Sequence, residues 1–392
     1  MTIQEESLKL HYKLKGKLGT SFKVNVKNKH DLALAYTPGV AEPCLEIQKD
    51  VSKSYDLTAR GNMVAVITDG TAVLGLGDIG PEASMPVMEG KCILFKSFAG
   101  IDAVPVLIDS KDVDEIVRTV ALISKTYGGI NLEDISAPRC FEIERRLKEI
   151  CDIPVFHDDQ HGTAIVAGAG MINAAKVVGK RLEDMTVVIS GAGSAGIAIA
   201  KFLLGLPMKD VILCDKQGIL HEKSQGLNSE QQRMVKVVNR SGKQGTLADA
   251  LQGADAFIGV SAPGIVSKEM VKSMAQDPIV FAMANPDPEI MPDLAMEAGA
   301  KVVGTGRSDF ANQINNVLAF PGVFKGALKV RARDITDQMI EAAAYAIAGL
   351  MEPEELEQGK VIPQPFDPRV VKVVARAVAQ EAKRQGVARL EE

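Results

Sequence analysis

The sequence predicts an α/β protein with two domains, each built on a parallel sheet covered by helices. Three observations support this fold class. Short apolar runs alternate with helical periodicity from residue 63 onward, a glycine-rich loop follows one of these runs near the middle of the chain, and a length of 392 residues is enough for two ordinary cores. We place the first domain at residues 1–162 and the second at residues 163–392, with C-terminal helices that pack back.

The first domain is predicted from apolar runs that are typical of buried parallel strands. These strands are expected at Met63–Thr68, 103–108, Gly129–Leu132 and 153–156. Helical periodicity is found at 85–98, 113–123 and Arg139–Ile150. The lysine-rich first 30 residues look helical at best, and we expect them to form an oligomerisation arm.

The second domain opens with a predicted helix at 163–178, which is rich in Ala, Gly and Val and has almost no charge. Such a helix is expected to be buried between the two domains. Strands are predicted at 185–190, 211–214, 256–260, 279–283 and 301–304, with a helix at 194–204 after the first strand. Further helices are expected at 335–351 and 370–385. This series indicates a doubly wound sheet.

Composition and charge exclude several classes of protein. The chain is 46% hydrophobic and 24% charged, which is typical of a soluble globular protein, and its net charge of −5 offers no basic field for nucleic acid. It has no apolar stretch of membrane-spanning length and no signal peptide at its start. Its five cysteines form no CxxC pair. We therefore expect a cytoplasmic protein that binds neither membranes nor nucleic acid.

Acidic residues follow two predicted strands of the first domain: Glu133 and Asp134 after one, Asp158 and Asp159 after the other. The carboxyl ends of parallel strands meet at one edge of a sheet, where α/β proteins build their sites. Clustered carboxylates repel one another unless a hard divalent cation joins them. Glu133, Asp134 and Asp159 are therefore candidate ligands for Mg²⁺ or Mn²⁺. Zinc, with help from neighbouring histidines, and simple helix capping remain alternatives.

A GxGxxG pattern, GAGSAG at 191–196, follows an apolar strand directly and opens a helix. Its glycines permit a tight turn, a close approach to a pyrophosphate and close helix–strand packing, and the helix N-terminus supplies N–H donors. Asp215 ends the next strand and can accept from an adenosine ribose 2′-OH. The candidate cofactor-binding residues are Gly191, Gly193, Ser194, Ala195, Gly196 and Asp215. Together they predict a Rossmann-type NAD(P)-binding domain rather than a glycine turn with a surface aspartate.

The charge of Asp215 bears on the choice between the two dinucleotides. Its carboxylate repels a 2′-phosphate and so favours NAD over NADP. Lys216 follows immediately and could offset that repulsion.

Two other side chains are suited to proton transfer. Lys91 lies in a largely apolar stretch, and beside a metal it could act as a base oriented by Asp158. Tyr36 lies on a Pro-Gly turn. Taken singly, a lysine such as Lys91 is typical of the solvated face of a helix, and a tyrosine such as Tyr36 is typical of a surface loop.

These residues lie in blocks that resemble the malic enzyme family of the short bacterial and archaeal type. The blocks are YTPGVA (36–41), ITDGTAVLGLGDIGP (67–81), MEGK (88–91), NLEDI (131–135), HDDQHGTA (157–164), GAGSAG (191–196), FAMANP (281–286) and GRSDFANQINNVLAFPGV (306–323). They occur in the family's order through nearly the whole chain. The resemblance implies oxidative decarboxylation of (S)-malate to pyruvate and CO₂ with reduction of NAD(P)⁺, a bound Mn²⁺ or Mg²⁺, and a homodimer.

The resemblance also implies individual roles. Tyr36 is the expected general acid, Lys91 the general base and Asp158 the residue that orients it, while metal ligation falls to Glu133, Asp134 and Asp159. The expected substrate contacts are Asn285 and Asn316, with Asn315 beside them, and Asn285 is also expected to touch the cofactor. The longer eukaryotic forms have an arginine for malate where this chain has Ala72, so Arg307 is considered for the second carboxylate.

Two other functions remain open. An enzyme of this fold could act on another 2-hydroxy acid, or stop at the keto acid, so that oxaloacetate accumulates instead of pyruvate. A non-catalytic dinucleotide-binding scaffold is the second alternative, although every proposed catalytic position is filled. We also expect the N-terminal arm with Tyr36 to reach the cleft of the neighbouring subunit.

Overall fold

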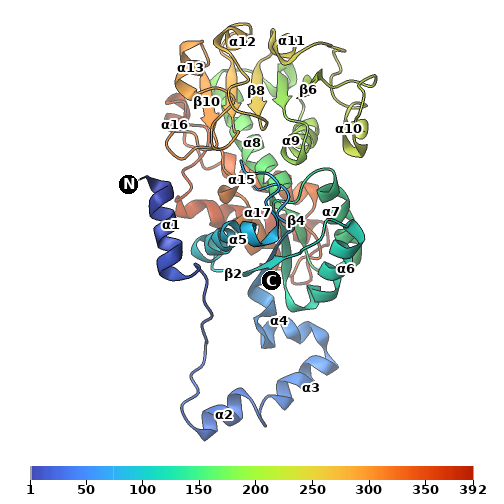
Figure 1. Ribbon diagram of the computed structural model, residues 1–392, viewed down its shortest axis with the longest axis vertical. Coiled ribbons are helices and arrows are strands. Elements are labelled where there is room, and N and C mark those ends of the chain that lie inside the picture. The colour runs from blue at the N-terminus through green and yellow to red at the C-terminus, as the bar shows by residue number, and fades with distance from the viewer. Residues whose placement is uncertain (1, 74, 392) are drawn as a thin grey trace.

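The computed structural model describes residues 2–73 and 75–391, so Leu74 of the 67–81 block lies outside the described residues. Two parallel sheets are stacked along the long axis of the molecule, and C-terminal helices lie beside both (Figure 1). The predicted α/β class is confirmed. In the part of the chain described here, no helix combines the length and the apolar character needed to cross a bilayer.

The first sheet has the strand order β2-β1-β3-β4, and every pairing is parallel. Its strands are β1 (Met63–Thr68), β2 (Asp102–Leu107), β3 (Gly129–Leu132) and β4 (Val155–His157). Side chains of β1 alternate between two cores. Val64 and Val66 face α5 (Pro81–Leu94), while Ala65 and Ile67 face α6 (Val113–Ile123) and α7 (Arg139–Ile150). Burial on both faces explains why these strands read as continuous apolar runs.

The second sheet has the order β10-β9-β8-β5-β6-β7, and only the short β7 is antiparallel. Its strands are β5 (Thr186–Ser190), β6 (Asp210–Asp215), β7 (Gly218–Ile219), β8 (Ala256–Gly259), β9 (Ile279–Ala282) and β10 (Val302–Thr305). Its helices are α9 (Ser194–Gly205), α10 (Ser229–Met234), α11 (Leu247–Leu251), α12 (Lys268–Lys272) and α13 (Pro292–Glu297). The chain leaves β5 towards β6 and returns to the other side at β8. The loops after β5 and β8 therefore diverge at a switch point, where such sheets bind ligands.

Helix α8 (Asp158–Val177) links the two sheets and is buried along most of its length. It begins five residues before the predicted start, so the expected boundary between residues 162 and 163 lies inside a continuous helix. The polar run after Phe156 resembles a loop in sequence, but Asp158 and Asp159 suit the positive end of a helix dipole. Close packing against α9 is achieved at Gly168, where a Cβ would overlap the ring of Phe202.

The C-terminal helices return to the first domain. They are α14 (Phe320–Lys329), α15 (Asp337–Ala348), α16 (Pro353–Glu357) and α17 (Pro368–Arg384), and α17 packs against α14 and α15. Phe320 and Phe324 of α14 lie edge-on to Phe95, with ring centroids 4.8 and 5.3 Å away. The predicted return of these helices is confirmed, and their aromatic contacts place them on the α5 side of the first sheet.

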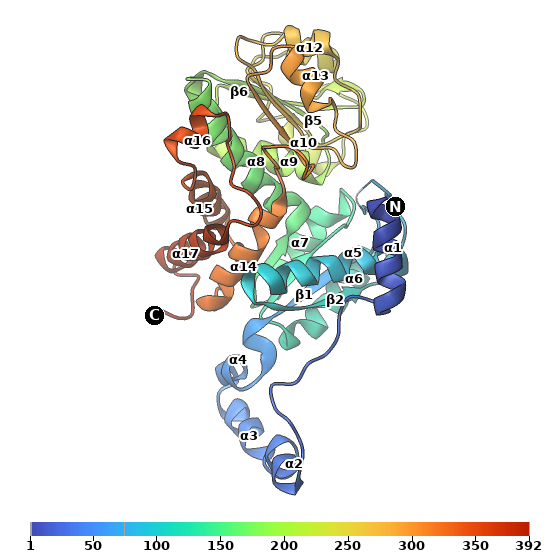
Figure 2. The same cartoon turned by 90° about the vertical axis from the view of Figure 1, so that its left-hand side faces the viewer.

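The N-terminal segment contains α1 (Ile3–Leu14), α2 (Lys29–Ala35), α3 (Ala41–Lys49) and α4 (Ser54–Leu57). Helices α1 to α3 bury no residue. In both views α1 lies beside α5, whereas α2 and α3 project away from the body (Figures 1 and 2). We call residues 18–50 the arm. Its large exposed apolar side chains are Leu18, Phe22, Val24, Val26, Leu32, Leu34, Tyr36, Val40 and Leu45.

Candidate active site

Three carboxylates converge where β3 and β4 end. Glu133, Asp134 and Asp159 each offer an oxygen, and these oxygens all lie within 4.8 Å of one another. Asp134 has a positive φ of 53°, a conformation that aspartate tolerates better than most residues and that turns the chain sharply after β3. Its backbone N–H donates to Asp159 Oδ2 at 2.8 Å, and its own Oδ2 is buried without a hydrogen-bond partner. An orphaned oxygen in a carboxylate cluster fits a hard divalent cation.

Lys91 meets this cluster from α5. Its ammonium lies 2.5 Å from Asp158 Oδ2 and 2.8 Å from Glu133 Oε1, and 4.2 Å from the ring centroid of Phe320. The side chain is only 8% exposed. Asn131 donates to the other oxygen of Glu133 at 2.8 Å. Lys91 is therefore held in one position by two carboxylates and an aromatic face.

The cluster is electrostatically unbalanced. Burial, followed by repulsion from neighbouring carboxylates, raises the pKa of Asp134 to about 9. Burial likewise raises the pKa of Glu133 to about 7, of Asp158 to about 7 and of Asp159 to about 6. For Lys91, burial alone lowers the pKa, but Asp158 and Glu133 more than offset it, so its pKa lies above the ordinary value. One ammonium cannot balance four carboxylates, three of them buried, and a divalent cation would supply the missing charge.

The dinucleotide loop lies after β5, as predicted. Gly191 has a φ of +109°, and a Cβ there would meet the carbonyl oxygen of Val260 at 2.5 Å. A Cβ at Gly196 would overlap the carbonyl of Gly191, whereas a Cβ at Gly193 would point into open space. Asp215 ends the adjacent strand β6, and the N–H of Gly191 donates to Cys214 O at 2.9 Å. These geometries match the turn, the packing contact and the ligand approach that the pattern predicts.

A cavity of about 840 Å³ joins the loop to the carboxylates. Residues from both domains line it, and those predicted for the site are Lys91, Glu133, Asp134, Asp159, Ser194, Ala195, Asn285, Asn315 and Asn316. Asn315 also accepts from the N–H of Val317 at 3.0 Å and caps the 3-10 turn Asn316–Leu318. A dinucleotide at the loop and a small acid at the carboxylates would share one enclosed space.

Several residues considered from the sequence do not line this cavity: Tyr36, Asp158, Gly191, Gly193, Gly196, Asp215 and Arg307. Arg307 instead donates to both carboxylate oxygens of Asp309, at 2.8 and 2.9 Å, so the expectation that it neutralises a substrate carboxylate is not supported. Tyr36 is on the arm, 67% exposed.

The cavity also contains residues that sequence reasoning missed: Ser7, His11 and Lys17 from α1 and the turn after it. Lys17 donates its backbone N–H to Glu89 at 2.9 Å and a hydrogen of its ammonium to Pro86 O at 2.7 Å, which fixes it against the middle of α5. The lysine-rich start of the chain was the one available signal, and no spacing singles out Lys17.

The fold and the cavity define a dinucleotide-binding α/β protein with a carboxylate cluster in the same cavity as its dinucleotide loop. Residues 15–148 match the family model for the malic enzyme N-terminal domain, and residues 160–383 match that for the malic enzyme NAD binding domain. The chain belongs to the malic enzyme family.

Individual relatives are similar over nearly the whole of this chain. The chain is 58% identical over 391 residues to the bifunctional malic/malolactic enzyme of Bacillus subtilis, covering 100% of this chain and 95% of that protein. It is 56% identical over 374 residues to the NAD-dependent malic enzyme of Geobacillus stearothermophilus, covering 95% and 78%. The crystal structure of malic enzyme from Pyrococcus horikoshii superposes with a TM-score of 0.95 at 46% identity, covering 100% and 93%.

Proposed function

We propose that this chain catalyses oxidative decarboxylation of (S)-malate to pyruvate and CO₂ with reduction of a nicotinamide dinucleotide. The observation that carries the proposal is the shared cavity: Lys91 and the carboxylate cluster face the same space as the dinucleotide loop. The family assignment supports the same reaction.

Glu133, Asp134 and Asp159 are proposed to hold Mg²⁺ or Mn²⁺. Their convergence, burial and raised pKa values support this role. When bound, the ion would supply Lewis-acid polarisation of the substrate oxygens. It would also neutralise Glu133, one of the two carboxylates that keep Lys91 protonated, and so would lower the pKa of Lys91.

The residues of the chain would move two protons. Neutral Lys91, oriented by Asp158, takes the proton of the C2 hydroxyl as hydride leaves C2 for the bound dinucleotide. Loss of CO₂ from the resulting oxaloacetate leaves enolpyruvate. Tyr36 then protonates C3 of enolpyruvate. Asn285 and Asn316 are proposed to orient the substrate carboxylate through their side-chain amides, with Asn315 as the support for the turn that presents Asn316.

The second carboxylate of malate still needs a cation, because Ala72 provides none. We propose Lys17, which lines the cavity from the turn after α1. A Cβ at Gly90, the neighbour of Lys91, would lie 3.8 Å from the Lys17 ammonium. The amine therefore lies against α5, beside the residue that precedes Lys91.

We propose a homodimer in which the arm supplies Tyr36 to the partner's site. The exposed apolar side chains of the arm support docking on another copy, as does the absence of buried residues in α2 and α3. Within one chain α2 and α3 project away from both sheets (Figure 2), and no residue of the arm lines the cavity. The site is therefore incomplete without the partner.

The remaining assignments are proposals of the same kind. Residues 1–162 supply the metal ligands and the proton-transfer groups, and residues 163–392 bind the dinucleotide. Helix α8 belongs to both parts. Asp215 favours NAD over NADP. Five cysteines without a disulfide among the described residues support a cytoplasmic location.

A steady-state assay tests the function. The full-length protein is incubated with malate and either NAD⁺ or NADP⁺, with Mn²⁺ or with EDTA, and pyruvate, oxaloacetate and lactate are quantified. We expect metal-dependent pyruvate formation with reduced dinucleotide in equal amounts. Accumulated oxaloacetate would indicate a simple dehydrogenase, and lactate without net reduction would indicate the malolactic reaction named for the B. subtilis relative.

A further inference from the structure

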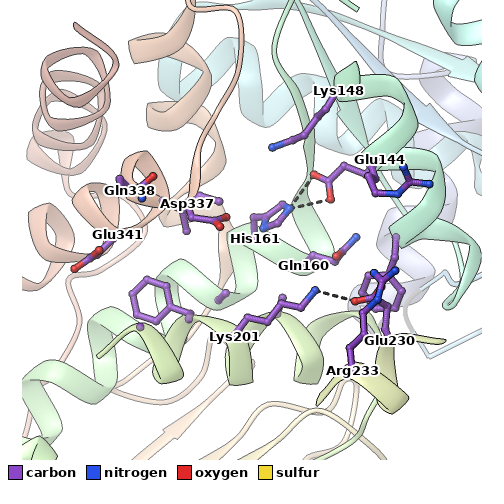
Figure 3. A pocket seen from close by; sticks show the side chains of 17 residues that line it. Glu144, Lys148, Gln160, His161, Lys201, Glu230, Arg233, Asp337, Gln338 and Glu341 are labelled. Carbon is purple, nitrogen blue, oxygen red and sulfur yellow. Dashed lines mark hydrogen bonds and ion pairs between the residues drawn. The ribbon is translucent and has the colours of Figure 1, made fainter. Parts of the chain in front are cut away.

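A second cavity, of about 490 Å³, lies on the other face of α8 from the candidate active site. Figure 3 shows the residues that line it. Asp159, Thr163 and Val166 line the active-site cavity, whereas Gln160, His161 and Ala164 line the second one. Helices α7, α9, α10 and α15 form its other walls. Its volume falls within the range of small-molecule sites, and its walls come from every major part of the fold.

Unsatisfied polarity points into this cavity. Gln160 is only 4% exposed, and its side-chain Nε2 is buried without a hydrogen-bond partner. Figure 3 shows its amide between Glu144 and Lys201. Lys201 donates to Glu230 at 3.0 Å, which leaves ammonium hydrogens for another acceptor. A buried donor without an acceptor is costly, so this wall is suited to a ligand oxygen.

The charges of the lining balance, but they are not evenly placed. The cations are Arg145, Lys148, Lys201 and Arg233, and the anions are Glu144, Glu230, Asp337 and Glu341. Glu144 pairs with His161, and Glu230 pairs with Lys201 and Arg233. Asp337 and Glu341, one turn apart on α15, have no ion-pair partner among the described residues. The cavity therefore has a donor-rich wall facing an acidic one.

Apolar surface lies between these walls. Phe141, Phe202 and Ile340 contribute it, together with the small side chains Ala164 and Ala198. A ligand that matches the donor-rich wall, the acidic wall and the apolar surface has no net charge. It carries a negative and a positive group at one end and has an apolar body.

We propose that this cavity is a regulatory site for an α-amino acid with an apolar side chain. Its carboxylate accepts from Gln160 and Lys201, its ammonium lies against Asp337 and Glu341, and its side chain packs on the two phenylalanine rings.

The cavity is connected directly to both halves of the active site. Glu144 accepts from the backbone N–H of His157 at 3.1 Å and from the His161 ring at 2.8 Å, on either side of Asp158 and Asp159. On α10, Gln231 donates to Ala192 O of the dinucleotide loop at 3.0 Å. A ligand that tightens α7, α8 and α10 would change how the carboxylates and the loop are held. This effect on turnover rests on the proposed function, whereas binding does not.

Calorimetric titration of the full-length protein with L-phenylalanine and L-leucine, without malate or dinucleotide, tests the site. We expect a dissociation constant below about 1 mM for at least one of them. 3-Phenylpropionate lacks the ammonium group and phenethylamine lacks the carboxylate, and each should bind at least about tenfold more weakly than phenylalanine. Glu341→Gln and the cavity-filling Ala198→Phe should weaken binding by a similar factor. Glu354→Gln, on α16 and outside the cavity, is the matched control.

Several outcomes would overturn the proposal. These are no heat of binding for either amino acid up to about 10 mM, unchanged affinity in Glu341→Gln, or equal affinity for 3-phenylpropionate. Should Ala198→Phe fail to fold, Glu341→Gln on the cavity rim decides. Saturating ligand should also change the initial rate of malate oxidation at least about twofold. Binding without that change would refute the regulatory role while leaving the proposed reaction intact.

Discussion

Lys91 illustrates how a residue with an ordinary solution pKa is fitted to its role by its neighbours. In the metal-free site Asp158 and Glu133 stabilise the charged form, which suits an ion-pair partner and not a base. A divalent cation on Glu133, Asp134 and Asp159 would neutralise Glu133 and add positive charge nearby, and both effects lower the pKa of Lys91, while Asp158 still orients the amine. Metal binding therefore favours the neutral base.

Replacing Lys91 by Ala should reduce kcat for malate oxidation by about 10²–10⁴. Lys91→Arg is the control, since it keeps a positive charge among the buried carboxylates but cannot lose its proton. Both variants should be inactive, while only Lys91→Ala should lose thermal stability in the metal-free state. A turnover close to wild type in either variant would remove Lys91 from proton transfer.

Lys17 should affect binding more than chemistry. If its ammonium neutralises the second carboxylate, Lys17→Met should raise KM for malate about tenfold or more with a much smaller change in kcat. Lys13→Met on exposed α1, which does not line the cavity, is the matched control. Equal KM values for the two variants would show that another group, including one from a partner subunit, holds that carboxylate.

At the scale of elements, the strands and the dinucleotide loop could be predicted from sequence because their signals are local. β1 and β3 have the predicted bounds, since burial on both faces leaves an uninterrupted apolar run. The start of α8 could not be predicted from sequence, because the polar side chains of its first turn belong to the site and do not follow the apolar pattern of a helix. β7 spans only two residues and leaves no pattern.

The same distinction holds for the candidate site: residues placed by the sheet could be predicted from sequence, and residues placed by long-range contacts could not. Carboxylates that follow strands are brought together by the sheet edge, so Glu133, Asp134 and Asp159 could be placed from topology alone. Lys17 reaches the cavity from a turn fixed by long-range hydrogen bonds to α5. The arm helices α2 and α3 bury no residue in their own chain, so they have no apolar core pattern from which they could be predicted.

Separation of Tyr36 from Lys91 predicts complementation between subunits. Protomers carrying Tyr36→Phe and protomers carrying Lys91→Ala should each form nearly inactive dimers. After mixing and reassembly, a random population should recover about a quarter of wild-type activity, because half of the dimers contain one intact site of two. Activity that stays at the level of the unmixed variants, with subunit exchange verified by mass, would mean that each chain uses its own Tyr36.

For the whole molecule, the carboxylate cluster makes stability depend on both metal and pH. The folded-state pKa values of about 7, 9, 7 and 6 for Glu133, Asp134, Asp158 and Asp159 lie above those of the unfolded chain. Their contribution to stability is fully present below the unfolded values and is lost as pH rises through the folded ones. The metal-free protein should therefore lose stability as pH rises from about 4, where the carboxyls of the unfolded chain ionise, to about 9.

His157 opposes this trend at acid pH. Burial lowers its pKa to about 4, below the value in the unfolded chain. Its contribution is present above the unfolded pKa of 6.5 and is lost as pH falls through about 4. Four carboxyls outweigh one histidine in this range, so the metal-free protein should be most stable near about pH 4.

Mn²⁺ replaces the protons that the cluster otherwise binds, so its stabilising effect should grow with pH. Saturation at about 100 times Kd stabilises a folded protein by about 2.7 kcal/mol, and Kd itself should tighten as the carboxyls ionise. Calorimetric Tm values with EDTA and with one fixed Mn²⁺ concentration, at about pH 6 and about pH 8.5, should therefore differ more at the higher pH. Asp134→Asn, which removes the carboxyl with the highest pKa, should raise the metal-free Tm at the higher pH and abolish most of the Mn²⁺ effect. An Mn²⁺-induced shift of equal size at both pH values would mean that the ion is held somewhere other than these carboxylates.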